Sequence, residues 1–220
     1  EHHANLVPWH LSRKKLKIIS SNLLSNGDLD YTDLLNKINP RTKLLAITHM
    51  SNVTGTITVF DQIKKKASNL NIPILVDGCQ YVPHKKLDIK ELDPDFYVFS
   101  AHKLYGPTGL GILYMKDKWI DELDPYQGGG SMIKNVETDS STYLDGNNKF
   151  EAGTPPIAQV IGLSYCLKFI NELSINNIYD YETELTEYAY DKMKTNNDIK
   201  IYGKSDNKTS IISFNLDGVH

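Results

Sequence analysis

The sequence predicts an α/β protein built on a mostly parallel sheet with flanking helices. Short apolar runs of strand type alternate with stretches of helical periodicity; the runs are 44–48, 72–76 and 96–99, and the helical stretches are 31–38, 59–70 and 88–92. Strands of about five residues that alternate with helices are typical of parallel sheets. The chain has 220 residues, of which 40% are hydrophobic and 23% charged, a composition that suits a folded globular protein.

Local patterns justify the individual elements. A helical stretch at 6–12 precedes an apolar run at 17–20, and the helix at 31–38 has Asp30 as a plausible N-cap. The helix at 59–70 is amphipathic, and its surface carries the lysines at 64–66.

A turn and a returning strand follow the third strand. Gly106-Pro107-Thr108-Gly109 predicts the turn, and 111–115 then reads as a strand. Because the connection is so short, this strand is expected to run antiparallel to its neighbour. Further on, Gly128-Gly129-Gly130 predicts a mobile or tightly turning loop.

The last part of the chain predicts a second unit. Helical patterns cover 157–173 and 178–193, and strand-type runs follow at 199–202 and 210–215. We place a boundary near Ser174, which divides the chain into a large domain, 1–173, and the beginning of a smaller α+β domain, 174–220. Neither end looks natural, since Glu1 is not a Met and the chain stops just after a strand-type run. We therefore expect an internal fragment, with the large domain incomplete on its N-terminal side and the small domain truncated.

Composition excludes several classes of function. The formal net charge is −3 and the pI is about 6.2, which argues against a nucleic-acid partner. No apolar run approaches the roughly 18 residues of a membrane span. The two cysteines, Cys79 and Cys166, cannot form a secreted disulfide framework, and we expect both to be packed residues.

Polar side chains follow three of the predicted strands. His49 and Asn52 come after the first, Asp77 and Gln80 after the second, and the triplet Ser100, His102 and Lys103 after the third. Since ligands of open α/β sheets bind beyond the carboxyl ends of the strands, one crevice is expected to gather these groups. The set does not suit a structural zinc site, and it lacks a Gly-x-Ser-x-Gly elbow for acyl transfer.

The set does suit pyridoxal 5′-phosphate (PLP). The aldehyde of PLP needs a Lys amine for a Schiff base, and its ring nitrogen needs a carboxylate to hold a proton. Its phosphate needs hydroxyl, imidazole or backbone donors, and its phenolic oxygen needs one donor. In that order, these needs match Lys103, Asp77, Ser100 with His102, and Gln80.

The string from Asp95 to Gly109, DFYVFSAHKLYGPTG, resembles the PLP-lysine signature of class V aminotransferases. Five further strings fit the Suf-type (group II) cysteine desulfurases and the closely related selenocysteine lyases: EHHAN at 1–5, NVTG at 52–55, VDG at 76–78, GGGSMI at 128–133 and FEAGTP at 150–155. The strings follow in collinear order along essentially the whole chain. The resemblance implies a PLP-dependent transferase of fold type I.

The resemblance also implies roles for individual residues. Lys103 would bind the cofactor aldehyde and move protons at the substrate α-carbon, and Asp77 would pair with the ring nitrogen. Gln80 would reach the phenolic oxygen, while Ser100 and His102 would hold the phosphate.

Three more positions take roles from the same resemblance. His2 would stack on the ring face and shuttle a proton. Asn52, which also heads an Asn-x-Thr triplet typical of glycosylation acceptors, would lie near the substrate carboxylate and the cofactor oxygen. Thr154 would reach the phosphate of a neighbouring subunit, which implies a homodimer with shared sites.

The implied reaction converts L-cysteine, or L-selenocysteine in a selenocysteine lyase, to L-alanine and enzyme-bound persulfide sulfur. The sulfur would pass to an acceptor protein for iron–sulfur cluster assembly, in the cytoplasm or in an organelle if a transit segment lies upstream. The family's nucleophilic Cys and carboxylate-binding Arg would follow His220, and an upstream phosphate-binding segment would precede Glu1. We therefore expect the fragment alone to be inactive.

Three alternatives remain. Another class V enzyme would share the fold: an aminotransferase, a kynureninase-like hydrolase or an epimerase. A non-catalytic paralogue would act as a scaffold, although Lys103, Asp77 and His102 together argue against it. A histidine-metal protein would use His2, His3 and His49.

Overall fold

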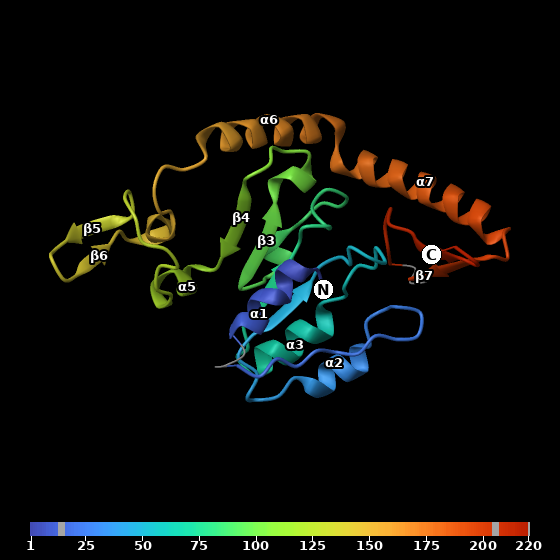
Figure 1. Ribbon diagram of the computed structural model, residues 1–220, viewed down its shortest axis with the longest axis horizontal. Coiled ribbons are helices and arrows are strands. Elements are labelled where there is room, and N and C mark those ends of the chain that lie inside the picture. Colours follow the sequence, from blue (N-terminus) through green and yellow to red (C-terminus); the bar gives the residue numbers. More distant parts are fainter. Residues whose placement is uncertain (13–15, 204–206, 220) are drawn as a thin grey trace.

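A four-stranded sheet forms the centre of the computed structural model, which describes residues 1–12, 16–203 and 207–219 (Figure 1). Its order is β1 (Leu45–Thr48), β2 (Ile74–Asp77), β3 (Phe96–Ser100) and β4 (Gly111–Met115). β1, β2 and β3 are parallel, and β4 returns antiparallel to β3. Both the α/β fold and the antiparallel return are as predicted.

The register of the sheet determines where the chemistry lies. Thr48 of β1 is paired with Asp77 of β2, and Asp77 is paired with Val98 of β3. The carboxyl ends of the three parallel strands therefore meet at one edge, as the sequence analysis requires.

The core lies between the sheet and the helices α2 (Tyr31–Lys37) and α3 (Asp61–Asn69). Ile63 and Ala67 of α3 are fully buried with Val76 of β2, because the apolar positions of the helix recur at helical spacing. The predicted cap of α2 is present, since the Asp33 N–H donates to Asp30 Oδ1 at 2.9 Å.

Two of the three lysines at 64–66 of α3 make hydrogen bonds to other segments and do not only face solvent. The ammonium of Lys64 donates to the Glu91 carbonyl at 2.6 Å, and that of Lys66 donates to the Leu35 carbonyl. Of the three lysines at 64–66, Lys65 is the one whose side chain is exposed. Two of the three lysines thus link α3 to neighbouring segments, since their long apolar stems let the charged ends reach backbone acceptors.

Shorter elements complete the large unit: η1 (His3–Asn5), α1 (Val7–Ser12), α4 (Ile89–Leu92), η2 (Ala101–Leu104), α5 (Asp117–Glu122), β5 (Ile133–Val136), β6 (Ser141–Tyr143) and η3 (Gly146–Phe150). The sequence did not predict the β5–β6 hairpin, which projects from the left of Figure 1. Every residue of both strands is exposed, so no burial pattern was available to indicate them.

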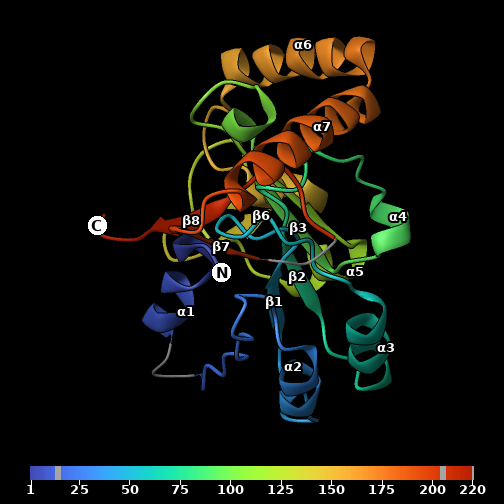
Figure 2. The same cartoon turned by 90° about the vertical axis from the view of Figure 1, so that its right-hand side faces the viewer.

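The C-terminal part contains α6 (Ile157–Leu173), α7 (Ile175–Lys194) and an antiparallel pair, β7 (Ile199–Tyr202) and β8 (Ser213–Leu216) (Figure 2). Ser174, which has a positive φ of 66°, separates the two helices. α7 begins directly after it at Ile175, three residues before the predicted start at 178. The predicted strand at 210–215 is observed as 213–216.

Several contacts join this part to the sheet unit, and two of them involve α7 and the segment before β8. His84 Nδ1 lies 2.7 Å from Glu182 Oε2 of α7, and the Ile57 N–H donates to the Asn207 carbonyl at 2.8 Å. His220 and 204–206, which belong to the predicted small domain, lie outside the described residues. No helix of the described residues is long and apolar enough to span a membrane.

Candidate active site

Asp77 is the centre of the candidate site. It ends β2 and is only 6% exposed. Its carbonyl accepts a hydrogen bond from the His49 N–H at 2.8 Å, and the next residue, Gly78, donates to the Val98 carbonyl at 2.9 Å. The neighbouring strands therefore hold the backbone on both sides of this carboxylate.

Ser100 and Lys103 reach the same edge from β3. β3 ends at Ser100, and the chain turns at once into η2, which carries His102 and Lys103. The Gly106 N–H closes this turn by donating to the Ala101 carbonyl at 2.9 Å. Burial raises the pKa of the Cys79 thiol beside Asp77, and the positive charge of Lys103 acts in the opposite direction, so the field of the amine reaches this edge of the sheet.

The N-terminal segment is tied to the end of β1. Glu1 Oε1 accepts the Thr48 N–H at 2.9 Å, and Glu1 Oε2 accepts Asn5 Nδ2 at 2.6 Å. Burial raises the pKa of the Glu1 carboxyl, and the charge of Asp77 raises it further. This tie brings His2, whose Nδ1 accepts the Ala4 N–H at 3.1 Å, to the edge of the sheet that carries Asp77.

The other predicted residues lie on flanking segments. Gln80 lies in the turn after β2 and is half-buried, as is Asn52 in the turn after β1. His102 is exposed on η2, and Thr154 is exposed just before α6. The structure thus brings Asp77 and Ser100 together around Cys79, with Lys103 on the turn that follows Ser100, and the roles of all the site residues stay predictions.

An aromatic group supports Asp77 from behind, and the sequence analysis missed it. Buried His49 stacks on Tyr81, with ring centroids 3.5 Å apart and an interplanar angle of 7°. Its Nδ1 lies 2.9 Å from the hydroxyl of Tyr97, which is 1% exposed. The ring of Tyr97 in turn lies directly against Gly78, where a Cβ would be 2.1 Å from Cζ. The glycine after Asp77 is therefore required by a close contact with Tyr97.

The pKa values of His49 and Tyr97 follow from the burial of both side chains. Burial, and then the charge of Lys85, lowers the pKa of His49 to about 3. Burial raises the pKa of the Tyr97 phenol. At neutral pH the imidazole is therefore uncharged and the phenol keeps its proton, so the 2.9 Å contact is a hydrogen bond between two neutral groups.

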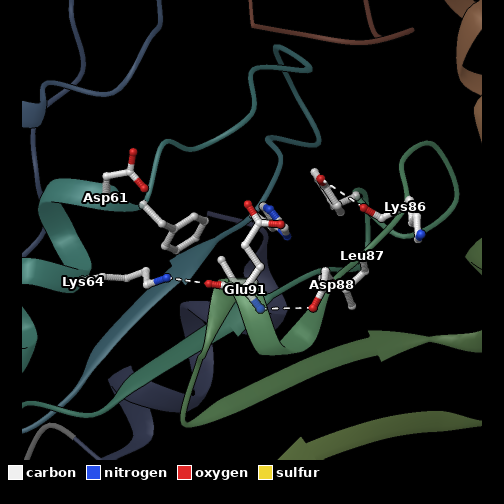
Figure 3. Close-up of a pocket in the computed structure, with 10 residues that line it drawn as sticks. Asp61, Lys64, Lys86, Leu87, Asp88 and Glu91 are labelled. Atoms are coloured by element: carbon white, nitrogen blue, oxygen red, sulfur yellow. Dashed lines mark hydrogen bonds between the residues drawn. The ribbon is translucent and has the colours of Figure 1, made fainter.

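Figure 3 shows a pocket of about 370 Å³ on another side of His49. Besides His49 and Tyr81, residues of α3, α4 and the segment before α4 line it, and the Lys64 ammonium donates to the Glu91 carbonyl at its rim. Asp77, Ser100 and Lys103 are not among its lining residues. This hollow is therefore distinct from the candidate site at the strand ends.

The histidine-metal alternative gains no support. The described residues contain no group of three or more His, Cys, Asp or Glu side chains placed to hold a metal ion. His49 is buried against Tyr97 and Tyr81, whereas His2 and His3 are exposed in the first turn of the chain.

The donor set fits PLP. A buried carboxylate at the end of a strand needs a cationic or hydrogen-bonding partner, which a protonated ring nitrogen supplies. Lys103 offers an amine for an aldehyde, and Ser100 offers a hydroxyl for a phosphate oxygen. A carboxylate, an amine and a hydroxyl at the end of a parallel sheet can therefore hold the three reactive parts of the cofactor.

Comparisons with known proteins agree with this reading. The chain is 45% identical over 224 residues to a cysteine desulfurase of Wigglesworthia glossinidia brevipalpis, covering all of this chain and 54% of that protein. The cysteine desulfurase CsdA of Escherichia coli superposes with a TM-score of 0.93 at 36% identity, over 100% of this chain and 55% of that one. The apo cysteine desulfurase of Thermococcus onnurineus NA1 gives 0.90 at 32% identity, over 100% and 56%.

The chain thus spans about half the length of the relatives that it matches. The family described as aminotransferase class-V matches residues 1–220. This range includes every element of the sheet and every residue of the candidate site. The chain belongs to the aminotransferase class-V family.

Proposed function

We propose that this chain forms the cofactor-binding half of a PLP-dependent cysteine desulfurase, which converts L-cysteine to L-alanine and protein-bound persulfide sulfur. The observation that carries the proposal is the sheet edge at which buried Asp77 ends β2 and Ser100 ends β3, with Lys103 in η2, which follows at once. Bound PLP supplies an electron-withdrawing ring that makes bonds at the substrate α-carbon easier to break.

Each residue of the site has a role at the cofactor that follows from the chemistry of its side chain. Lys103 binds the cofactor aldehyde and moves a proton at the substrate α-carbon, since an amine near the reacting carbon acts as nucleophile and then as base. Asp77 holds the proton on the ring nitrogen. Ser100 and His102 bind the phosphate, and Gln80 donates to the phenolic oxygen.

The remaining roles belong to the rim of the site. The tie between Glu1 and Thr48 holds η1 beside β1, and this favours a place for His2 over the face of the cofactor ring. Asn52 orients the substrate carboxylate from the turn after β1. The sulfur passes to a cysteine outside residues 1–220, because Cys79 is held beside Asp77 and Ser100 and Cys166 lies on α6 against the Tyr105 carbonyl.

We also propose a homodimer with shared sites. Thr154 is exposed, and α6, which begins at Ile157, exposes apolar side chains along its length: Ile157, Val160, Ile161, Tyr165 and Phe169. Apolar surface of this kind is typical of subunit interfaces. In such a dimer, the Thr154 hydroxyl reaches the phosphate bound by the neighbouring subunit.

The dimer can be tested by mixing subunits. The Thr154→Val variant is expected to bind PLP about 10–100 times more weakly, since a hydrogen bond to a charged group contributes about 1.5–3 kcal/mol. At limiting PLP, mixed dimers of Thr154→Val and Lys103→Ala chains regain one complete site. About a quarter of the sites then recover when the two variants are mixed equally. No recovery in dimers shown to be mixed would contradict a shared site.

Further proposals concern the wider setting. The sulfur goes to an acceptor protein for iron–sulfur cluster assembly, in the cytoplasm, and L-selenocysteine is a second candidate substrate. We place the domain boundary at Ser174. Two observations support this division: the backbone of Ser174 has a positive φ, and β7 and β8 form a separate sheet after it.

The test uses the full-length protein loaded with PLP. L-cysteine and a reductant are added, and alanine and sulfide are quantified. Equal amounts of the two products are expected. Lys103→Ala abolishes both, whereas Lys65→Ala, an exposed position on α3, leaves them unchanged. A PLP-loaded protein that forms no alanine would refute the desulfurase activity and favour another class V reaction. A protein that takes up no PLP would refute the cofactor assignment.

A further inference from the structure

Cys79 occupies the middle of the candidate site. Its backbone N–H donates to Asp77 Oδ1 at 3.0 Å, and its Sγ lies 3.9 Å from Ser100 Oγ. The side chain is half-buried. The thiol therefore stands between the end of β2 and the end of β3, where the two strands present their functional side chains.

The charges around the thiol come from the same cluster. Burial raises the pKa of the Cys79 thiol, and a hydrogen bond from the thiol to Asp77, together with the charge of that carboxylate, raises it further. Ser100 and the ammonium of Lys103 act in the opposite direction. The groups proposed to hold the ring nitrogen and the phosphate thus contact Cys79, and the charge of the group proposed to bind the aldehyde acts on its thiol.

We infer that Cys79 is a further cofactor-contacting residue, and that covalent modification of its thiol and binding of PLP exclude each other. The inference rests on the proposed function, because Asp77 and Ser100, which contact Cys79, and Lys103, whose charge acts on its thiol, are the groups assigned to the cofactor. A planar group held by all three lies against the sulfur atom. A substituent on the sulfur therefore takes the space that the cofactor needs.

Cys166 supplies an internal control. It lies on α6 and, like Cys79, is a half-buried free cysteine. Its thiol donates to the Tyr105 carbonyl at 3.1 Å, which is at the far end of η2 from Ser100. PLP is therefore expected to leave the reactivity of Cys166 unchanged.

The experiment treats the full-length protein with iodoacetamide, with and without PLP, and follows both cysteine peptides by mass spectrometry. In this reaction the sulfur bonds to the methylene carbon, iodide leaves and the thiol proton goes to solvent. With PLP at about 100 times its dissociation constant, alkylation of Cys79 is expected to slow about a hundredfold, because only the cofactor-free protein reacts.

Two further measurements test whether a larger group at Cys79 prevents the binding of PLP. Protein alkylated at Cys79 beforehand is expected to show no visible absorbance band of bound PLP, whereas the Cys79→Ala variant binds PLP and keeps the band after alkylation. The Cys79→Phe variant, with its folding checked by circular dichroism, is expected not to bind PLP.

The outcomes separate this inference from the proposed function. If PLP binds while Cys79 is alkylated as fast as before, or if folded Cys79→Phe binds PLP normally, the inference is wrong and the proposed function stands. Equal slowing of Cys79 and Cys166 also refutes it, because the protection would then be general. If the unmodified protein binds no PLP, the proposed function fails.

Discussion

Acidification is expected to destabilise this protein through His49. The imidazole is 6% exposed, faces the rings of Phe60, Tyr81 and Tyr97, and has a pKa lowered to about 3 by burial and by Lys85. In the unfolded chain the group titrates near its ordinary pKa of 6.5. Between these values the unfolded state binds the extra proton, so stability is complete above about pH 6.5 and is lost as the pH falls.

The size of this loss of stability follows from the difference between the ordinary pKa of the imidazole and the pH of the experiment. Between the ordinary pKa and pH 5 the difference is about 1.5 pH units, and each unit corresponds to about 1.36 kcal/mol, so His49 accounts for about 2 kcal/mol. The assay is urea unfolding of the full-length protein at pH 7 and at pH 5. The His49→Gln variant is expected to lose about 2 kcal/mol less than the wild type between these pH values, although it is less stable at both.

The comparison of slopes cancels the other titrating groups, since they are common to both proteins. His10→Gln, at an exposed position of α1, is the control and is expected to keep the wild-type slope. Equal losses of free energy in the wild type and in His49→Gln would refute the argument, because a buried neutral imidazole would then contribute nothing to the pH dependence.

Two substitutions test the two ends of the sheet. Gly78→Ala places a Cβ 2.1 Å from Cζ of buried Tyr97. The backbone beside Asp77 must then move, at a cost of about 1–3 kcal/mol, and PLP affinity, measured by titration, is expected to fall about tenfold or more. Gly111→Ala, whose Cβ meets nothing within 4 Å, should leave the affinity unchanged, and equal affinities of both variants would contradict the contact. Asp95→Ala removes the acceptor of the Ile74 N–H, of Trp119 Nε1 and of the Lys118 ammonium. It is expected to cost about 2–4 kcal/mol in urea unfolding without changing PLP affinity, whereas Asp93→Ala at an exposed ion pair costs less than about 1 kcal/mol. Equal losses in the two aspartate variants would show that the Asp95 network contributes nothing beyond a surface ion pair.

The sheet was predictable because burial leaves a pattern in the sequence. β1, β2 and β3 are short apolar runs with at least one fully buried position each, and each is followed by polar residues. The β5–β6 hairpin carries no such pattern, because both of its strands are exposed along their whole length. Periodicity reports burial, so an element that buries nothing escapes it.

The candidate site was predictable only in part, for a similar reason. Asp77, Ser100 and Lys103 follow strand ends, and the sequence itself places strand ends at one edge. The support behind them depends on contacts between distant residues, such as His49 with Tyr97 and Glu1 with Thr48, which are 48 and 47 positions apart. One signal was available: a glycine directly after a buried aspartate indicates a close approach, and here the approaching group is Tyr97.

The two buried aspartates of the sheet show why one end carries stability and the other chemistry. Asp95, before the amino end of β3, accepts the Ile74 N–H at Oδ2, and it accepts both Trp119 Nε1 and the Lys118 ammonium at Oδ1. Although burial raises its pKa, these donors outweigh burial and lower it. A carboxylate accepts about four hydrogen bonds, so side chains and backbone fill most of the capacity of Asp95. Among the described residues, the carboxylate of Asp77 accepts one backbone hydrogen bond, from Cys79, and otherwise meets the thiol of the same residue. It keeps acceptor capacity in a buried position, and the proposed pairing with a protonated ring nitrogen needs such capacity.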